Sequence, residues 1–213
     1  NPGGDLSLAA LRVAGAEDLV LQGLCTIINL RGLGEEEQLS TVSRLLAGLF
    51  EASAAGKIPP FYCILDEAHR FAGKDKTDAS MLVRRFAQEG RKFGANLIVV
   101  TQRPQLLDTT VRGLVGTWII HTLSDPNDVK IVMESGGLEH RWEREITWFE
   151  KGEALVTGEI VERTPLVIQV RRRETRHGAP GFNPLDFVTP EARARAGMRI
   201  GRKKLELLKR EAE

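Results

Sequence analysis

Short, continuous apolar runs alternate with longer stretches of mixed polarity through most of the chain. The runs are rich in β-branched residues, which predicts strands buried on both faces. They cover residues 24–30, 61–65, 96–102 and 117–123. The stretches around them predict helices with one apolar face, at about residues 35–50, 81–92, 106–115 and 124–135. This alternation predicts an α/β fold with a mostly parallel sheet and flanking helices.

The pattern changes in the last third of the chain. Residues 152–173 contain two β-rich runs around a polar centre, which predicts a β-hairpin. Further on, Thr189 followed by Pro190 is typical of a helix start, with Thr189 as the N-cap. We therefore predict that residues 1–175 form part of one α/β core and that residues 176–213 form a basic C-terminal tail with a helix.

The charge distribution also separates the end of the chain from the rest. The 213 residues carry a net charge of +1, but the segment from Arg163 onward holds 13 Lys and Arg against 6 Asp and Glu. A basic terminal segment often contacts phosphate groups or an acidic partner. A solvated surface fits the same pattern, and both interpretations stay open for the run from Arg171 to Arg173.

Cysteine usage and the lengths of the apolar runs limit the class of protein. Cys25 and Cys63 lie inside apolar runs, and the sequence has no C-x-x-C motif. This predicts buried, reduced thiols in an intracellular, cytoplasmic protein. No apolar run approaches the roughly 18 residues that cross a bilayer, so we expect no membrane segment. A hydrophobic content of 42% is enough for one sizeable core.

The segment FYCILDEAHRFAG, residues 61–73, carries the first candidate chemistry. Its apolar strand ends in Asp66 and Glu67, and ligands bind beyond the carboxyl ends of strands in an open parallel sheet. An apolar strand that ends in Asp-Glu is the Walker B arrangement of P-loop ATPases. There, Asp66 is expected to hold Mg²⁺ and Glu67 to polarise the water that attacks the γ-phosphate of ATP. Acids at the start of a helix are the simpler interpretation.

The next strand brings a third polar side chain to the same edge. This strand ends in the run TQRP, and its Gln102 can hydrogen-bond the γ-phosphate or the attacking water. A plain turn residue is the alternative interpretation of Gln102. Between the two strands, Arg91 and Lys92 stand at a predicted helix end. An arginine there can stabilise the charge on a transferring phosphate, in its own subunit or a neighbour's. A cation at a helix C-terminus needs no such role.

Three segments together resemble the HerA branch of the HerA/FtsK ATPases. They are FYCILDEAHRFAG, AQEGRKFGANLIVVTQRPQLLD and SDPNDVKIV, and the later GEALVTGEIVERTPLVIQVRRR is similar to the end of the same core. The resemblance covers residues from about 20 to 175. It implies a RecA-like P-loop NTPase core, ATP and Mg²⁺ as cofactors, and a homohexameric ring that translocates DNA. It also implies a NurA-type nuclease as partner, in DNA end processing and recombination repair.

The resemblance assigns roles to the polar residues of these motifs. Asp66 and Glu67 match the Walker B pair, with Asp66 as the Mg²⁺ ligand, and Gln102 matches the γ-phosphate sensor. Apart from the resemblance, His69 is interpreted as a hydrogen-bonded residue close to the site or as a core histidine. A relay between the nucleotide and DNA sites is the alternative role for His69.

The resemblance also assigns roles to three cations. Arg91 matches the arginine finger, and Lys92 is the second choice for that role. Arg103 is a neighbouring residue of the site without a defined role. Arg103 and Lys92 are therefore expected to lie near the bound nucleotide.

The sequence departs from this family at the phosphate loop. No G-x-x-x-x-G-K-[ST] motif occurs in it; AAGKIPP contains Lys57, but neither Ser nor Thr follows. Without such a loop nothing cradles the β- and γ-phosphates. The N-terminal β-barrel of the family is also missing. We therefore expect the C-terminal part of an ATPase core, with the loop upstream of Asn1 and no hydrolysis by these residues alone.

Two related functions stay open beside the repair translocase. One is the ATPase of a conjugation or secretion system that pumps DNA. The other is a non-catalytic oligomerisation module of such an ATPase. A DEAH-box helicase is disfavoured, because QEGRKFGANL does not match the Q-x-x-G-R-x-G-R motif of that class.

Overall fold

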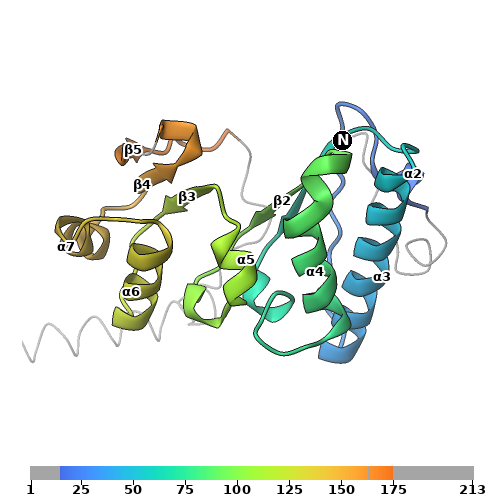
Figure 1. Ribbon diagram of the computed structural model, residues 1–213, viewed down its shortest axis with the longest axis horizontal. Coiled ribbons are helices and arrows are strands. Elements are labelled where there is room, and N and C mark those ends of the chain that lie inside the picture. The colour runs from blue at the N-terminus through green and yellow to red at the C-terminus, as the bar shows by residue number, and fades with distance from the viewer. Residues whose placement is uncertain (1–14, 163, 175–213) are drawn as a thin grey trace, which may run out of the picture. The chain divides into compact units, whose positions relative to one another are not determined.

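The computed structural model describes residues 15–162 and 164–174 (Figure 1). The described residues up to Val170 form one compact unit, and a second unit begins at Arg171. The predicted tail and its helix start at Thr189 lie outside the described residues. All elements below belong to the first unit.

The first unit has a parallel and an antiparallel sheet. β1 (Phe61–Leu65) and β2 (Ala95–Val99) pair in parallel. The second sheet has the strand order β3–β4–β5 and is antiparallel. Its strands are β3 (Thr117–Ile120), β4 (Glu153–Gly158) and β5 (Leu166–Gln169). The hairpin predicted within residues 152–173 is confirmed as β4 and β5.

Helices connect and flank the strands. The α-helices are α2 (Ala16–Leu19), α3 (Glu35–Ala54), α4 (Asp78–Glu89), α5 (Thr109–Gly113), α6 (Pro126–Ser135) and α7 (Arg141–Trp148). Short 3₁₀ turns are η1 (Ala68–Arg70), η2 (Gly90–Phe93), η3 (Pro104–Leu106) and η4 (Glu159–Val161). Side chains set some helix starts: Thr77 accepts from the Ser80 N–H at 3.2 Å, and Asp125 accepts from the Asn127 N–H at 2.8 Å. None of the described helices has the length and apolar character that a membrane span requires.

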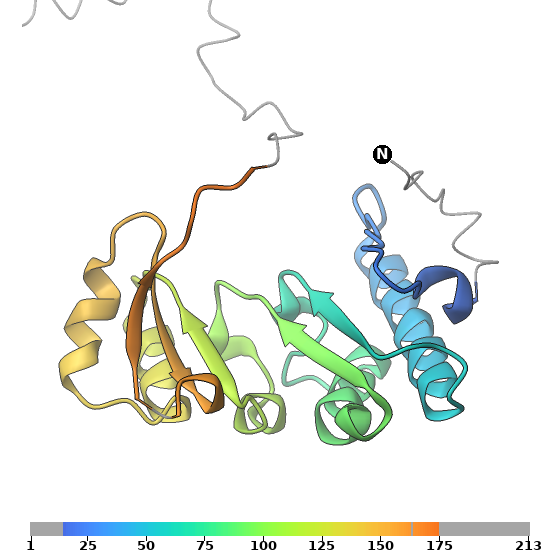
Figure 2. The same cartoon turned by 90° about the horizontal axis from the view of Figure 1, so that it is seen from above.

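One core joins the parallel sheet to α3 and α4. Phe50 of α3 and Phe86 of α4 are buried and meet edge to face, with ring centroids 5.4 Å apart. Phe61 of β1 lies edge-on to Phe86 at 6.5 Å. Figure 2 shows α3 and α4 close to the two strands. Aromatic side chains from three elements therefore hold the sheet and these helices together.

Replacing Phe86 with Ala is expected to lower the free energy of unfolding by about 3–5 kcal/mol, because the large buried ring leaves a cavity that closes only in part. Phe86→Leu keeps most of the apolar volume and should cost about 1.5 kcal/mol or less. Urea unfolding followed by circular dichroism measures both. Equal stabilities for the two variants would contradict the packing around this ring.

A second core lies between the antiparallel sheet and the helices α6 and α7. Its buried side chains are Ile120 of β3, Val132 of α6, Ile146 of α7 and Leu155 of β4. Helix α6 also packs against η3, the turn that follows β2. The loop after β2 is thus a place where the two cores meet.

Residues 24–30 do not form the predicted buried strand. They have no regular secondary structure, and Leu24 and Ile27 are 58% and 81% exposed. A strand in a parallel sheet needs backbone pairing with a neighbour, and among the described strands β1 pairs with β2 alone. The apolar run therefore lacks the ladder that would make it a strand. The predicted burial of Cys25 is wrong for the same reason, since Cys25 is exposed.

The strand predicted at residues 117–123 is present as β3 but does not join the parallel sheet. Instead, Ile119 lies opposite Val156 of β4 in an antiparallel ladder. The polarity pattern along the sequence predicts that a segment is a strand. The strand it pairs with depends instead on which other segment the fold places beside it. The antiparallel hairpin that follows supplies that segment here.

One face of the parallel sheet carries large apolar side chains in contact with solvent. Tyr62 and Ile64 of β1 are 71% and 61% exposed, and Ile98 of β2 and Val100 just beyond it are also exposed. Ile64 lies beside Ile98 in the register, so these side chains share a face. Parallel sheets are ordinarily covered on both faces, whereas the first core covers the other face only. We call the residues Tyr62, Ile64, Ile98 and Val100 the open face.

Burial raises the pKa of the Cys63 thiol from 9.0 to about 11. Alkylating reagents attack the thiolate, so Cys63 should react at least about tenfold more slowly at pH 8 than the exposed Cys25. Because the folded pKa is the higher one, the protonated thiol favours the folded state below pH 9, and this contribution is lost as the pH rises towards 11. Iodoacetamide labelling with mass spectrometry measures the alkylation rates of Cys25 and Cys63, and the variant Cys25→Ser leaves Cys63 as the thiol that reacts. Equal rates would contradict the burial of Cys63.

Candidate active site

The carboxyl ends of β1 and β2 lie side by side and present polar residues at one edge of the sheet. The pairing continues past the strands: the Val100 N–H donates to the Leu65 carbonyl, and the Ala68 N–H donates to the Val100 carbonyl, both at 2.9 Å. These bonds hold the two segments in register. The acidic pair after β1 therefore stands next to Gln102, which follows β2.

The structure brings Glu67 and Gln102 together at this edge. Gln102 Nε2 donates to Glu67 Oε1 at 3.2 Å. Both side chains are open to solvent, since the Glu67 side chain is 43% exposed and the hydrogen bond is itself exposed. A carboxylate and an amide in this position suit the orientation of a water molecule beside a terminal phosphate.

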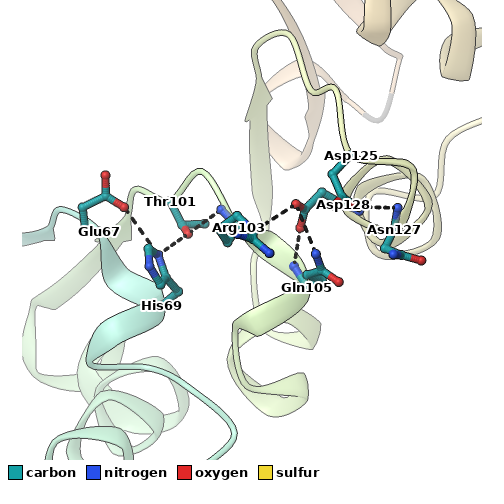
Figure 3. A network of polar contacts seen from close by, with 8 residues as sticks. All are labelled: Glu67, His69, Thr101, Arg103, Gln105, Asp125, Asn127 and Asp128. Carbon is teal, nitrogen blue, oxygen red and sulfur yellow. Dashed lines mark hydrogen bonds and ion pairs between the residues drawn. The ribbon is translucent and has the colours of Figure 1, made fainter.

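His69 and Thr101 extend this pair. His69 Nδ1 lies 3.4 Å from Glu67 Oε2 and 3.0 Å from Thr101 Oγ1 (Figure 3). Thr101 Oγ1 also accepts from the Arg103 backbone N–H at 3.0 Å. A proton on Nδ1 faces both oxygens, and in that tautomer the ring holds the Glu67 carboxylate in place. These contacts fit the interpretation of His69 as a hydrogen-bonded neighbour of the site.

The backbone of Glu67 is left-handed, with φ of 49° and ψ of 43°. Glu67 and Glu162 are the non-glycine residues with positive φ in the part of the chain that the structure describes. This conformation costs about 1–2 kcal/mol for a residue with a Cβ atom. Strained residues of this kind concentrate at functional sites, which is consistent with a site at Glu67.

Comparing Glu67→Gly with Glu67→Ala isolates this strain, because both variants lack the carboxylate. We expect the glycine variant to be more stable by about 1 kcal/mol, since glycine adopts the left-handed region freely. In the middle of α3, Arg44→Gly should instead be less stable than Arg44→Ala by about 1 kcal/mol. Thermal or urea unfolding measures all four. The same order at both positions would contradict a strained backbone at Glu67.

Asp66 is exposed beside Glu67, and its Oδ1 accepts from the Glu67 N–H at 3.0 Å. Within the described ranges, no group of three or more His, Cys, Asp and Glu residues is arranged to hold a metal ion. Mg²⁺ in nucleotide sites is held by one or two carboxylates together with phosphate oxygens and water. A single Asp66 therefore fits an ion that binds together with a nucleotide.

One buried carboxylate ties the loops that follow β1 and β2. The Asp108 N–H donates to the Ala72 carbonyl at 2.8 Å, and Asp108 Oδ1 accepts from the Thr110 N–H at 2.9 Å at the start of α5. Asp108 Oδ2 pairs with Arg84 Nη2 of α4 at 2.9 Å. Removing one partner of a buried ion pair is strongly destabilising. Asp108 thus contributes to holding the site edge in a fixed geometry.

Arg91 and Lys92 lie at the opposite edge of the parallel sheet. Both belong to η2, which precedes β2, and the Phe61 N–H at the start of β1 donates to the Gly94 carbonyl at 2.9 Å. Gly94 has φ of 76°, which suits glycine and turns the chain into β2. At roughly 3.3 Å per residue, the strands separate the two edges by about 15 Å. The structure therefore does not bring Arg91 or Lys92 to Glu67 of the same subunit.

Arg103 points away from Glu67 and towards α6 (Figure 3). Its Nε lies 3.7 Å from Asp128 Oδ2. Asp128 is the fifth residue of the segment SDPNDVKIV, and the sequence alone assigned it no role. The Arg103 backbone N–H contacts Thr101, whereas its guanidinium pairs with Asp128, and a role of Arg103 near a bound nucleotide stays a prediction.

Comparison with curated proteins finds helicases of the HerA type. A DNA double-strand break repair helicase HerA from Sulfurisphaera tokodaii is 31% identical over 166 residues, which cover 74% of this chain and 33% of that protein. The HerA of Pyrococcus furiosus is 35% identical over 119 residues, 55% of this chain and 22% of that protein. The chain is a relative of the HerA helicases. A probable helicase of Methanocaldococcus jannaschii, 34% identical over 139 residues, covers 62% of the chain and 27% of its own length.

The similarity to HerA concerns only part of each relative. The chain spans about a third or less of the length of these three proteins. No family model matches the chain. The relation to HerA therefore stands on the matched part of the chain.

Solved structures show the fold of this HerA relative. The genome packaging NTPase B204 of Sulfolobus turreted icosahedral virus 2, in complex with ATP-gammaS, gives a TM-score of 0.56 at 16% identity and covers 75% of this chain and 72% of its own. VirB4 of Thermoanaerobacter pseudethanolicus also gives 0.56, at 14% identity, over 70% of this chain and 41% of its own. The predicted fold class, an α/β core of the RecA-like type, is confirmed in its fold, but among the described strands only β1 and β2 pair in parallel, so the sheet is not mostly parallel as predicted.

Proposed function

We propose that the chain is part of an ATP-driven DNA translocase of the HerA type. One observation carries this proposal: Glu67 and Gln102 are hydrogen-bonded at the carboxyl edge of two parallel strands, with Asp66 beside them. That edge is where ligands bind in open parallel sheets. The names of the relatives, which are helicases in DNA double-strand break repair, support the same function.

Each residue at this edge has one task in the proposal. Bound ATP with Mg²⁺ supplies the phosphoryl group and neutralises part of its charge. Asp66 binds the ion, and Glu67 orients the attacking water and accepts its proton. Gln102 donates to the γ-phosphate or to that water. Gln102 donates to Glu67 in the present structure. Binding of a phosphate would therefore replace the Glu67 carboxylate with a phosphate oxygen as the acceptor of the Gln102 amide.

Hydrolysis in this proposal needs a phosphate-binding loop that the chain does not contain. The 213 residues have no G-x-x-x-x-G-K-[ST] motif. We propose that another segment of a longer protein, or a second chain, supplies the loop. The 213 residues alone are then expected to be inactive.

The finer assignments follow from the resemblance to HerA. They are a homohexameric ring with ATP sites at the subunit interfaces, a NurA-type nuclease as partner, and a cytoplasmic role in DNA end processing and recombination repair. The basic run from Arg171 to Arg173 suits contact with a DNA backbone. The role in DNA end processing has the testable consequence that DNA ends stimulate hydrolysis.

ATP hydrolysis by the full-length protein, measured with and without linear duplex DNA, tests the proposal. We expect Mg²⁺-dependent hydrolysis that rises with DNA, and a stimulation that falls as the salt concentration is raised, because phosphate contacts release counterions. Failure of the full-length protein to bind ATP would reject the proposal. Hydrolysis without any response to DNA would reject the translocase.

A DNA-pumping ATPase of a conjugation or secretion system is the second candidate. The similarity in fold to VirB4 favours it. An ATPase of that kind works with membrane-bound partners, so the full-length protein would sediment with the membrane fraction. Recovery in the soluble fraction together with a nuclease would favour the repair translocase.

A further inference from the structure

Asp128 is a buried carboxylate at the start of α6, and the chemistry proposed above does not use it. It is 1% exposed and occupies the third position of the helix, after the N-cap Asp125. Asp125 already caps this helix, since its Oδ1 accepts from the Asn127 N–H at 2.8 Å and from the Asp128 N–H at 3.4 Å. A buried carboxylate costs free energy unless polar partners compensate it. The side chain of Asp128 therefore serves contacts outside its own helix.

The partners of this carboxylate in the described structure come from the loop after β2. Asp128 Oδ1 accepts from the Gln105 N–H at 2.9 Å, and Oδ2 lies 3.5 Å from Gln105 Nε2 and 3.7 Å from Arg103 Nε. Figure 3 shows these contacts converging on one side chain. The short bond to a backbone N–H fixes the main chain as well as side chains. Asp128 thus anchors residues 103–105 to α6.

The same loop carries the residues that touch Glu67. Gln102 donates to Glu67 Oε1, and the Thr101 hydroxyl contacts both His69 Nδ1 and the Arg103 N–H. Residues 101–105 therefore contact the acidic edge at one end and Asp128 at the other. A shift of α6 would be transmitted to the side chains next to Glu67 through these hydrogen bonds.

The position of α6 is set by the second core. Val132 of α6 is buried there against the antiparallel sheet and α7. The contact between Asp128 and the loop is accordingly a polar link from that core to the site edge. Both cores belong to the same compact unit, and this contact joins them beside the site.

We propose that Asp128 is a positioning residue that holds Gln102 against Glu67 and makes this contact depend on the position of α6. The inference rests on the proposed function, in which Gln102 faces the terminal phosphate. Arg103 acts in it as the partner that compensates the buried charge. Movement of the second core and phosphate hydrolysis would then be coupled through one carboxylate.

Kinetics of the full-length protein test this inference. Asp128→Asn keeps the size of the side chain but loses its charge, and we expect kcat for ATP hydrolysis to fall about tenfold while KM for ATP changes less than about twofold. The matched control is Asp125→Ala, which removes the cap of the same helix without touching the loop. Its kcat should stay within about twofold of the wild type. Arg103→Gln combined with Asp128→Asn should be no slower than the slower single variant, because the two residues act as a pair.

Hydrogen–deuterium exchange of residues 101–106 provides a readout that does not require hydrolysis. We expect exchange in this segment of the full-length protein to rise about tenfold in Asp128→Asn and to stay unchanged in Asp125→Ala. Unchanged exchange in Asp128→Asn, a wild-type kcat in that variant, or equal losses in the Asp125 control would each overturn the inference. If the wild-type protein does not hydrolyse ATP, the proposed function fails, and exchange alone then decides whether Asp128 positions the loop.

Discussion

Replacing Glu67 with Gln in the full-length protein is expected to lower kcat for ATP hydrolysis by about 10³-fold, because a general base of this type contributes about 10²–10⁴. Nucleotide affinity should change little, since the amide has nearly the same shape and Glu67 is assigned to the reacting water. Hydrolysis is measured by phosphate release and affinity by titration with a fluorescent ATP analogue.

Glu162→Gln is the matched control for this variant. Glu162 shares the left-handed backbone of Glu67, with φ of 49° at both positions, but it follows η4 in the hairpin of β4 and β5. It should keep wild-type kcat. Normal turnover by Glu67→Gln would refute the role of Glu67, and equal losses in both variants would point to a general loss of structure rather than to the Glu67 carboxylate.

Replacing Arg91 with Ala is expected to lower kcat by about 10³-fold or more, if Arg91 is the arginine finger of a neighbouring subunit. The structure places Arg91 at the opposite edge of the sheet from Glu67, so a role within its own subunit is not available to it. Lys92→Ala is the control, because Lys92 is also an exposed cation in the same turn. It should retain most of the activity.

Mixing the two inactive variants distinguishes action between subunits from a general loss of structure. In a ring, an Arg91→Ala subunit still offers Glu67, and a Glu67→Gln neighbour still offers Arg91. With free exchange of subunits, about a quarter of the interfaces in an equal mixture hold both residues, and activity should return accordingly. Mixtures that stay inactive at every ratio would contradict action between subunits.

The part of the site that could be predicted from the sequence is the part that local pattern determines. An apolar run identifies β1, and the two acids that follow the run must lie at the carboxyl end of that strand. A second apolar run, before TQRP, identifies β2 in the same way and places Gln102 at its carboxyl end. Parallel pairing then forces Glu67 and Gln102 to meet. No knowledge of side-chain packing is needed for that step, since the ladder alone sets it.

The unpredicted parts depend on contacts between segments distant in sequence. Nothing local distinguishes residues 24–30 from a strand, because only a pairing partner would make them one. The contact of Asp128 with Gln105 requires that α6 pack on η3, and polarity along the chain carries no sign of that packing. Asp128 does have a signal, however: an acid that follows an adequate N-cap, Asp125, is free for another partner.

The open face has a consequence for how this chain behaves as a reagent. Tyr62 and Ile64 expose apolar surface on the open face of the two parallel strands. Exposed apolar surface of this kind promotes self-association in water. Oligomers formed by the 213 residues in solution would therefore reflect non-specific hydrophobic association through that face. The number of subunits in such oligomers would not indicate the number in an active ring, in which this face must be covered.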